Sequence, residues 1–332
     1  MTCSTRAGLT VAVAVVLLGT SCGDDTDREA AASRPTVVVT TNILGDVVAG
    51  VVGDGFDVVT IMPVGADPHD FQASARQVAQ IGEADVVIVN GAGFEEGLID
   101  VIEAVEADGV PVFEAISVVE TIEFGGHEGH DEHEDGDAHE EDGEHDEDGE
   151  HDHEGVDPHF FTDPARTAVV ADAVAEFLIA TVDGIDVEAV RTSAEAFVAE
   201  LEAVDRDVEE VLGAIPAERR VLVTNHEVFG YFADRYGFEV VGTVIPGGTT
   251  GDGTSARDLT ELAEVIERED VPAVFGDTSA SGDLARTLAA EVGDVAVVEL
   301  YSESLGAEDT DGATYAEMMR TNARRIADAL AG

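Results

Sequence analysis

Short apolar runs alternate with amphipathic stretches from Thr36 to the end of the chain. The runs are rich in β-branched residues and lie at 36–40, 56–62, 85–90, 110–115, 220–225, 239–245, 272–277 and 295–300. Continuous apolar runs separated by helical patterns are typical of parallel strands that are covered on both faces. Four runs in each half therefore predict two α/β lobes, each with a four-stranded parallel sheet flanked by helices.

One long amphipathic stretch, from about Asp186 to Ile215, separates the two sets of runs. Its apolar residues recur at steps of three and four: Val187, Val190, Ala194, Phe197, Leu201, Val204, Val208 and Val211. No Gly or Pro interrupts it before Gly213, so the pattern predicts one continuous helix of about 40 Å. A coiled-coil dimer would show the same stripe, but the flanking strand patterns favour packing within the chain. We expect a stiff connection between the lobes.

The first 22 residues have the pattern of an export signal, with Arg6 ahead of the apolar stretch "AGLTVAVAVVLLG". That stretch is too short to span a membrane comfortably. The following "LLGTSC" resembles a bacterial lipobox, in which Cys22 would be lipidated and become the mature N-terminus. The alternative is an ordinary cleaved signal with an incidental cysteine. Residues 23–35 are polar and Ala-rich, as expected of a flexible tether.

The composition excludes several classes of function. The net charge of −56 argues against nucleic acid or an anionic membrane surface as partner. The chain contains no Lys, so the Gly-rich "GGTTGDGT" after Pro246 is not a phosphate-binding loop, and Schiff-base chemistry is excluded. Cys3 and Cys22 are the only cysteines, which excludes a zinc finger, a thiol nucleophile and a disulfide framework in the folded body.

Seven of the ten histidines lie in a stretch that is otherwise almost all Asp, Glu and Gly. They are His127, His130, His133, His139, His145, His151 and His153. Charge repulsion predicts a disordered loop at 125–155, and no strand end or rigid turn presents these histidines. We interpret the loop as an accessory that collects zinc loosely. The alternative is a solvated acidic insertion with no metal role.

The other three histidines have more informative positions. His69 follows the run at 56–62, and His226 directly follows the run at 220–225. Ligands of parallel α/β sheets bind at the carboxyl ends of the strands, so these two side chains are expected at such a crevice, one in each lobe. His69 and His159 each stand in the phrase "DPH", where the proline restricts the backbone ahead of the histidine. Such rigid presentation suits a metal ligand.

A fourth ligand is expected from the end of the last strand. Glu303 stands three residues beyond Leu300, and Asp277, at the end of the previous run, is the competing candidate. Three imidazoles and one carboxylate form a closed set for Zn²⁺ that leaves little room for a catalytic water, whereas Mn²⁺ prefers more oxygen ligands. Glu95 and Glu96 are interpreted as surface or loop-capping carboxylates.

The chain resembles the zinc/manganese solute-binding lipoproteins of bacterial ABC importers. The matching phrases are "VGADPHDFQAS", "EADVVIVNGAGFEEGL", "DPHFFTDPARTAVVADAVAEFL", "VTNHEVFGYFADRYGFEVVG" and "TYAEMMRTNARRIADAL", in the family's order and over nearly all of the chain from Thr36. The resemblance implies two α/β lobes joined by one long helix, with the metal between them. It places the ligands at His69, His159, His226 and Glu303, the last in place of the family's usual Asp. A histidine at the third position and a His-rich insertion are marks of zinc members.

The expected organisation follows from these patterns and the resemblance together. It comprises a lipoprotein signal peptide at 1–22, a tether at 23–35, an N-terminal lobe at 36–185, a linking helix at 186–215 and a C-terminal lobe at 216–332. The expected function is capture of Zn²⁺ on the outer face of the cytoplasmic membrane, by a lipid-anchored monomer, and delivery to an ABC permease with its ATPase. Manganese binding within the same family is the alternative, and a zinc-dependent hydrolase is less favoured, since "HEVFG" at 226–230 lacks the second histidine of "HExxH".

Overall fold

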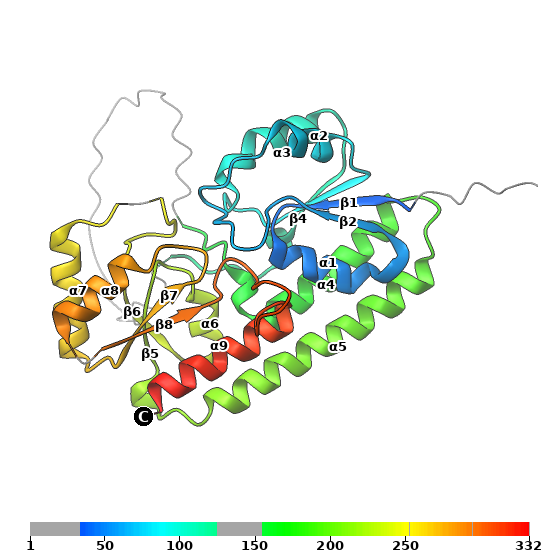
Figure 1. Cartoon of the computed structure of the whole chain (residues 1–332). Coiled ribbons are helices and arrows are strands. Elements are labelled where there is room, and N and C mark those ends of the chain that lie inside the picture. The colour runs from blue at the N-terminus through cyan, green and yellow to red at the C-terminus, as the bar shows by residue number, and fades with distance from the viewer. Residues whose placement is uncertain (1–33, 125–154, 252, 294, 332) are drawn as a thin grey trace, which may run out of the picture. The chain divides into compact units, whose positions relative to one another are not determined.

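Two four-stranded parallel sheets form the framework of the computed structural model, which describes residues 34–124, 155–251, 253–293 and 295–331 (Figure 1). The first sheet has the order β2-β1-β3-β4 and the second the order β6-β5-β7-β8, with every pair parallel. The strands are β1 (Thr36–Val39), β2 (Asp57–Thr60), β3 (Val86–Val89), β4 (Val112–Glu114), β5 (Val221–Thr224), β6 (Glu239–Thr243), β7 (Ala273–Asp277) and β8 (Ala296–Leu300). Each apolar run therefore contains one strand, which confirms the predicted fold class.

Nine α-helices surround the sheets in the described part of the chain (Figure 1). They are α1 (Asn42–Val52), α2 (Ala75–Gly82), α3 (Ile99–Ala107), α4 (Pro164–Thr181), α5 (Val187–Leu212), α6 (Gly230–Tyr236), α7 (Ala256–Arg268), α8 (Asp283–Val292) and α9 (Tyr315–Leu330). We call the first sheet with α1–α4 the first lobe, and the second sheet with α6–α9 the second lobe. Among the described residues, no helix combines the length and apolar character needed to cross a membrane.

Helix α5 is the long connecting helix expected from the sequence. The Asp186 side chain accepts the Ala189 N–H and starts the helix, which ends before Gly213, three residues earlier than expected. Its buried side chains include five of the eight residues of the predicted stripe, namely Val190, Ala194, Leu201, Val204 and Val208, and also Leu212. These residues pack against α1 and α4 of the first lobe and α9 of the second lobe. One helix of about 40 Å therefore supports both lobes.

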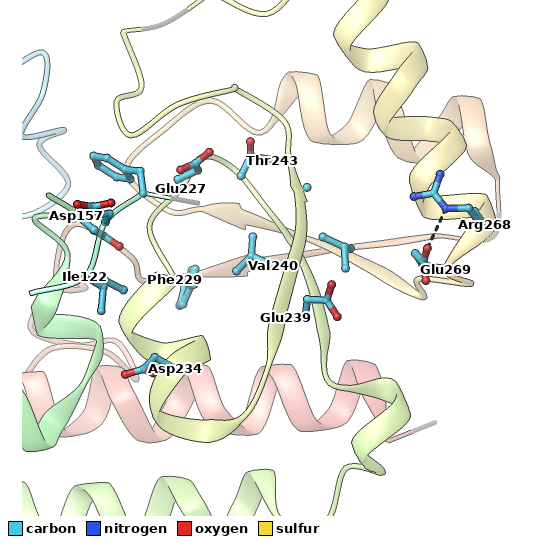
Figure 2. Close-up of a pocket in the computed structure, with 15 residues that line it drawn as sticks. Ile122, Asp157, Glu227, Phe229, Asp234, Glu239, Val240, Thr243, Arg268 and Glu269 are labelled. Atoms are coloured by element: carbon cyan, nitrogen blue, oxygen red, sulfur yellow. Dashed lines mark hydrogen bonds and ion pairs between the residues drawn. The ribbon is translucent and has the colours of Figure 1, made fainter. Parts of the chain in front are cut away.

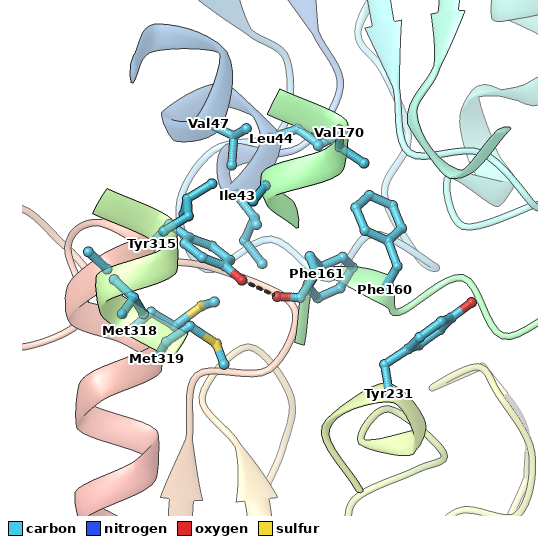
Figure 3. Packing of buried hydrophobic residues seen from close by; sticks show 14 of the residues in the cluster. Ile43, Leu44, Val47, Phe160, Phe161, Val170, Tyr231, Tyr315, Met318 and Met319 are labelled. Carbon is cyan, nitrogen blue, oxygen red and sulfur yellow. Dashed lines mark hydrogen bonds between the residues drawn. The ribbon is translucent and has the colours of Figure 1, made fainter. Parts of the chain in front are cut away.

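The apolar core continues from one lobe into the other. Figure 3 shows Ile43 from α1, Val170 from α4 and Met318 from α9 packed into one cluster. Within it the Tyr315 hydroxyl donates to the Phe161 carbonyl oxygen at 2.8 Å. Because close-packed interiors deform little, a core shared in this way holds the lobes at a nearly constant angle.

A largely buried carboxylate also joins α5 to the second lobe. Asp205 accepts hydrogen bonds from the Arg235 guanidinium and, at 3.0 Å, from the Tyr236 hydroxyl. We expect Asp205→Ala to lower the free energy of unfolding by about 2–3 kcal/mol, because a guanidinium and a buried hydroxyl lose their acceptor. Denaturant unfolding measures this change. The matched control is Asp207→Ala on the same helix, where the exposed ion pair with Arg320 contributes less than about 1 kcal/mol. Equal losses in the two variants would contradict the prediction.

Candidate metal centre

Four side chains that are far apart in the sequence meet at one buried point. They are His69, His159, His226 and Glu303, and one ligand-type atom of each lies within 4.8 Å of the others. The Nε2 atoms of the three histidines, in that order, lie 2.8, 3.4 and 3.1 Å from Glu303 Oε1. None of the four residues is more than 7% exposed. Three imidazole nitrogens and a carboxylate oxygen thus converge away from solvent.

The ends of the parallel strands bring these side chains together. His226 lies two residues after β5, and Glu303 lies three residues after β8. His69 lies in the longer loop between β2 and α2, while His159 directly precedes a short 3-10 turn, Phe160–Thr162, that leads into α4. The structure therefore places His69 and His226 beyond the carboxyl ends of strands in different lobes, where parallel sheets bind their ligands.

The aspartate of the second "DPH" phrase orients its histidine. Asp157 Oδ1 accepts the His159 backbone N–H at 2.8 Å and lies 2.7 Å from its Nδ1. With Nδ1 held as a donor, the free nitrogen Nε2 points to Glu303. Neither His159 Nε2 nor Glu303 Oε2 has a hydrogen-bond partner among the described residues, although both are buried. Unpaired buried acceptors of this kind fit a bound cation.

The aspartate of the first "DPH" phrase is used differently. Asp67 Oδ1 accepts the His69 backbone N–H at 3.0 Å, and its Oδ2 accepts the Thr250 hydroxyl from the second lobe at 2.6 Å. The His69 ring instead has its Nδ1 3.4 Å from Glu96 Oε1. The sequence interpretation gave no role to Asp67 or Asp157. It took Glu96 as a surface or loop-capping carboxylate, and Glu96 is indeed exposed. The repeated Asp two residues before His was the available signal.

Aromatic rings close the centre on the side of the first lobe. Phe94 lies with its ring centroid 5.3 Å from that of His69 and 5.4 Å from that of His159. The ring centroid of Phe161 lies 6.0 Å from that of His159. Phe94 and Phe161 are at most 1% exposed. They exclude water, and so the electrostatic attraction of the ligands for a cation is strengthened.

The four groups strongly affect one another's protonation. Burial raises the pKa of Glu303, but the charge of His226 and the close approach of the three histidine Nε2 atoms outweigh it and hold the pKa well below its usual range. Burial lowers the pKa of His69, but hydrogen bonds to Glu303 and Glu96 together with the Glu303 charge raise it to about 10. Burial also lowers the pKa of His159. The charge of Asp157 and its hydrogen bond outweigh this effect, so the pKa of His159 is raised overall. Without a metal, the centre therefore holds protons that a cation must displace.

Asp277, the competing fourth ligand, lies outside the four-residue cluster. Its two oxygens accept hydrogen bonds from the Ser279 N–H and hydroxyl, each at 2.8 Å. Burial and the nearby charge of Glu303 raise the pKa of Asp277 to about 7. Glu95 is also buried and caps the loop after β3, accepting the Asn90 N–H at 2.6 Å. The structure thus brings Glu303, and not Asp277, to the three histidines.

An acidic pocket of about 450 Å³ lies beside the centre, between the segment around Ile122 and the second lobe (Figure 2). Its carboxylates are Glu123, Asp157, Glu227, Asp234, Glu239 and Glu269, and Arg268 is its one basic lining residue. Phe124 lines the pocket, and its ring centroid lies 6.3 Å from that of His159. The pocket thus places a negatively charged surface near His159.

Other parts of the sequence interpretation lie outside the described residues. These are the export signal and tether with Cys22, and the loop with His127, His130, His133, His139, His145, His151 and His153. Their predicted roles stay predictions.

Comparisons with known proteins agree with the fold. Residues 37–329 match the family described as zinc-uptake complex component A, periplasmic. The chain is 29% identical to the manganese-binding lipoprotein MntA of Bacillus subtilis, covering 98% of this chain and 99% of that one. It is 30% identical to the zinc-binding protein TroA of Treponema pallidum, covering 91% of each. A solved structure of the Treponema periplasmic zinc-binding protein TroA superimposes with a TM-score of 0.76 at 27% identity, over 90% of this chain and 99% of that one.

Proposed function

Because this chain belongs to the family of zinc-uptake complex component A, we propose that it captures Zn²⁺ outside the cytoplasm and delivers it to the permease of an ABC importer. The observation that carries the proposal is the buried convergence of three imidazole Nε2 atoms on the Glu303 carboxylate. Three nitrogens and one carboxylate make a closed set that suits a tetrahedral ion. The metal is cargo in this reading, and His69, His159, His226 and Glu303 hold it.

Zinc is favoured over manganese by the ligand types. Manganese is a harder ion that prefers oxygen, and the centre offers nitrogen at three of four positions. Manganese remains the second candidate, because the similar lipoprotein of Bacillus subtilis is named for that ion. A zinc-dependent hydrolase fits less well. It needs an open coordination position for water, and here buried side chains and aromatic rings surround the ligands.

The remaining parts of the proposal concern location and partners. Lipidation of Cys22 would anchor a monomer to the outer face of the cytoplasmic membrane, beside a permease and its ATPase. The loop at 125–155 would collect zinc loosely, and the acidic pocket beside His159 would attract the cation on its way to the centre. The shared core and helix α5 support release by a small shift at the centre on docking to the permease, rather than by wide opening of the lobes.

Elemental analysis of the protein purified without residues 127–154 tests the proposal. One equivalent of zinc per chain would support it, because the loosely binding histidines are then absent. One equivalent of manganese per chain would instead favour manganese, the second candidate, as the metal that the protein binds. A chain that takes up neither ion, even when each is supplied in excess, would overturn the assignment of the centre.

Zinc binding should release protons, about one or more per ion at pH 7. The pKa of His69 is raised to about 10 in the metal-free protein, so its imidazole must lose a proton before Nε2 can bind. The apparent affinity should therefore rise with pH up to about 10, and fall as acid returns the proton. Calorimetry in buffers of different ionisation enthalpy counts the protons. The control is Glu303→Gln, which removes the charge that raises the pKa of His69 and should release fewer protons. Identical heats in all buffers would contradict the prediction.

A further inference from the structure

The loop that carries Glu303 belongs to the second lobe by sequence, but the two residues that follow Glu303 form hydrogen bonds with the first lobe. The Ser304 hydroxyl oxygen accepts the Gly65 N–H at 2.6 Å and lies 3.0 Å from the donating Asn42 Nδ2. The Leu305 N–H donates to Asn42 Oδ1 at 2.7 Å. Ser304 is fully buried and Asn42 is 8% exposed. Both residues that follow the carboxylate ligand are therefore held by the first lobe.

Asn42 is well placed to hold this loop. It is the first residue of α1, where the Thr41 side chain caps the helix by accepting the Leu44 N–H. Besides its bond to Ser304, Asn42 Nδ2 donates to the Pro63 carbonyl oxygen at 3.2 Å. Pro63 and Gly65 lie in the loop that carries His69. Asn42 and Ser304 thus join the loop of Glu303 to the loop of His69, close to where the two side chains meet at 2.8 Å.

The other ligands divide between the lobes. His159 lies in the first lobe, where Asn90 Nδ2 donates to the carbonyl oxygen of the preceding Pro158 at 2.9 Å. The backbone of His226 is held within the second lobe, since its carbonyl oxygen accepts the Thr224 hydroxyl at 2.7 Å and the Val228 N–H at 2.9 Å.

We infer that Asn42 and Ser304 are positioning residues that fix Glu303 against His69. Glu303 is then tied to the first lobe together with His69 and His159, although Asn322 of the second lobe also holds Tyr301, two residues before it. The backbone of His226, in contrast, is held within the second lobe. A small displacement of the second lobe would withdraw His226 first and leave the other three ligands in place. This inference rests on the proposed function, because it assigns roles within the same centre.

The chain offers a matched control on the other side of Glu303. Ser302 is also buried, at 2% exposed, but its hydroxyl bonds to Asp277 within the second lobe. Ser304→Ala and Ser302→Ala thus each remove one buried hydroxyl next to the carboxylate ligand, and only the first removes a contact between the lobes.

The test is a double-mutant cycle in the chain without residues 127–154. The zinc dissociation constant, from competition with a chelator, is measured for Ser304→Ala and Ser302→Ala with Glu303 intact and again with Glu303→Ala. We expect Ser304→Ala to weaken binding by about 10–100-fold, the loss typical of an outer-shell partner, and Ser302→Ala to weaken it less than about 10-fold. In the Glu303→Ala background Ser304→Ala should have no further effect, because the residue acts through Glu303. The Co²⁺ absorption spectrum of Ser304→Ala should resemble that of Glu303→Ala.

Equal losses in the two serine variants, or a loss that persists without Glu303, would overturn the inference and indicate general loosening of the loop. Thermal unfolding of the metal-free variants shows whether each is folded. If Ser304→Ala does not fold, Asn42→Ala removes the same contact from the first lobe and enters the same cycle. Failure of the unaltered protein to bind zinc would count against the proposed function instead, so the two failures are distinguishable.

Discussion

His159→Ala should abolish tight binding of one zinc ion per chain. The imidazole is fully buried, its Nε2 has no hydrogen-bond partner among the described residues, and Asp157 holds the ring so that this nitrogen points to Glu303. Removing it leaves three ligands and a small buried cavity, and we expect the loss of affinity to exceed the roughly 10–100-fold that loss of an outer-shell partner causes. Native mass spectrometry after dialysis against a weak chelator measures the bound zinc.

As a control, bound zinc is measured in the chain without residues 127–154, both with His159 intact and with His159→Ala. Seven histidines that could bind zinc loosely are then absent, so any zinc that remains is bound elsewhere. His69→Ala in the same background should behave as His159→Ala does. If either variant still retains one tightly bound zinc per chain, the assignment of the centre is wrong.

Asp157→Ala should weaken zinc binding by about 10–100-fold, although Asp157 is not a proposed ligand. Its carboxylate lies 2.7 Å from His159 Nδ1, and such a partner sets the tautomer of a metal-binding imidazole and raises its basicity. Competition with a chelator measures the change in the dissociation constant, and thermal unfolding of the metal-free protein shows how much of the loss is structural.

Asp67→Ala is the matched comparison, because Asp67 stands at the same place in the other "DPH" phrase. It accepts the backbone N–H of its histidine, as Asp157 does, but its second oxygen binds Thr250 instead of an imidazole. The loss of affinity should therefore be smaller for Asp67→Ala. Losses of equal size would show that the turn, rather than the orientation of the His159 ring, is what matters.

The fold could be predicted because buried parallel strands have a simple sequence pattern. The central strands β1, β3, β5 and β7 are largely buried, so their residues are almost continuously apolar. The boundaries were less predictable. The run at 56–62 contains only a four-residue strand, Asp57–Thr60, because Ile61 and Met62 continue into the core as part of a loop.

The centre could be predicted in part for a related reason. The predicted end of a strand locates the backbone of the residues that follow it, so His226 could be placed at the carboxyl edge of its sheet. It does not indicate where the side chain points, and Asp277 and Glu303 therefore remained alternatives. Asp277, the last residue of β7, bonds to Ser279, whereas Glu303 lies in a loop whose Leu305 N–H donates to the distant Asn42. Contacts between residues so far apart leave no local pattern in the sequence.

The bond between Asn42 and Ser304 spans 262 positions, and His69 meets Glu303 across 234. Contacts between residues so far apart in the sequence form late in folding, because closing such long loops has a large entropic cost. A chain that emerges from the ribosome or crosses a membrane from its N-terminus presents both "DPH" histidines long before Glu303 and its loop arrive. The proposed set of four ligands is therefore complete only when almost the entire polypeptide has emerged and folded, so a nascent chain would lack the full set with which to hold a metal ion.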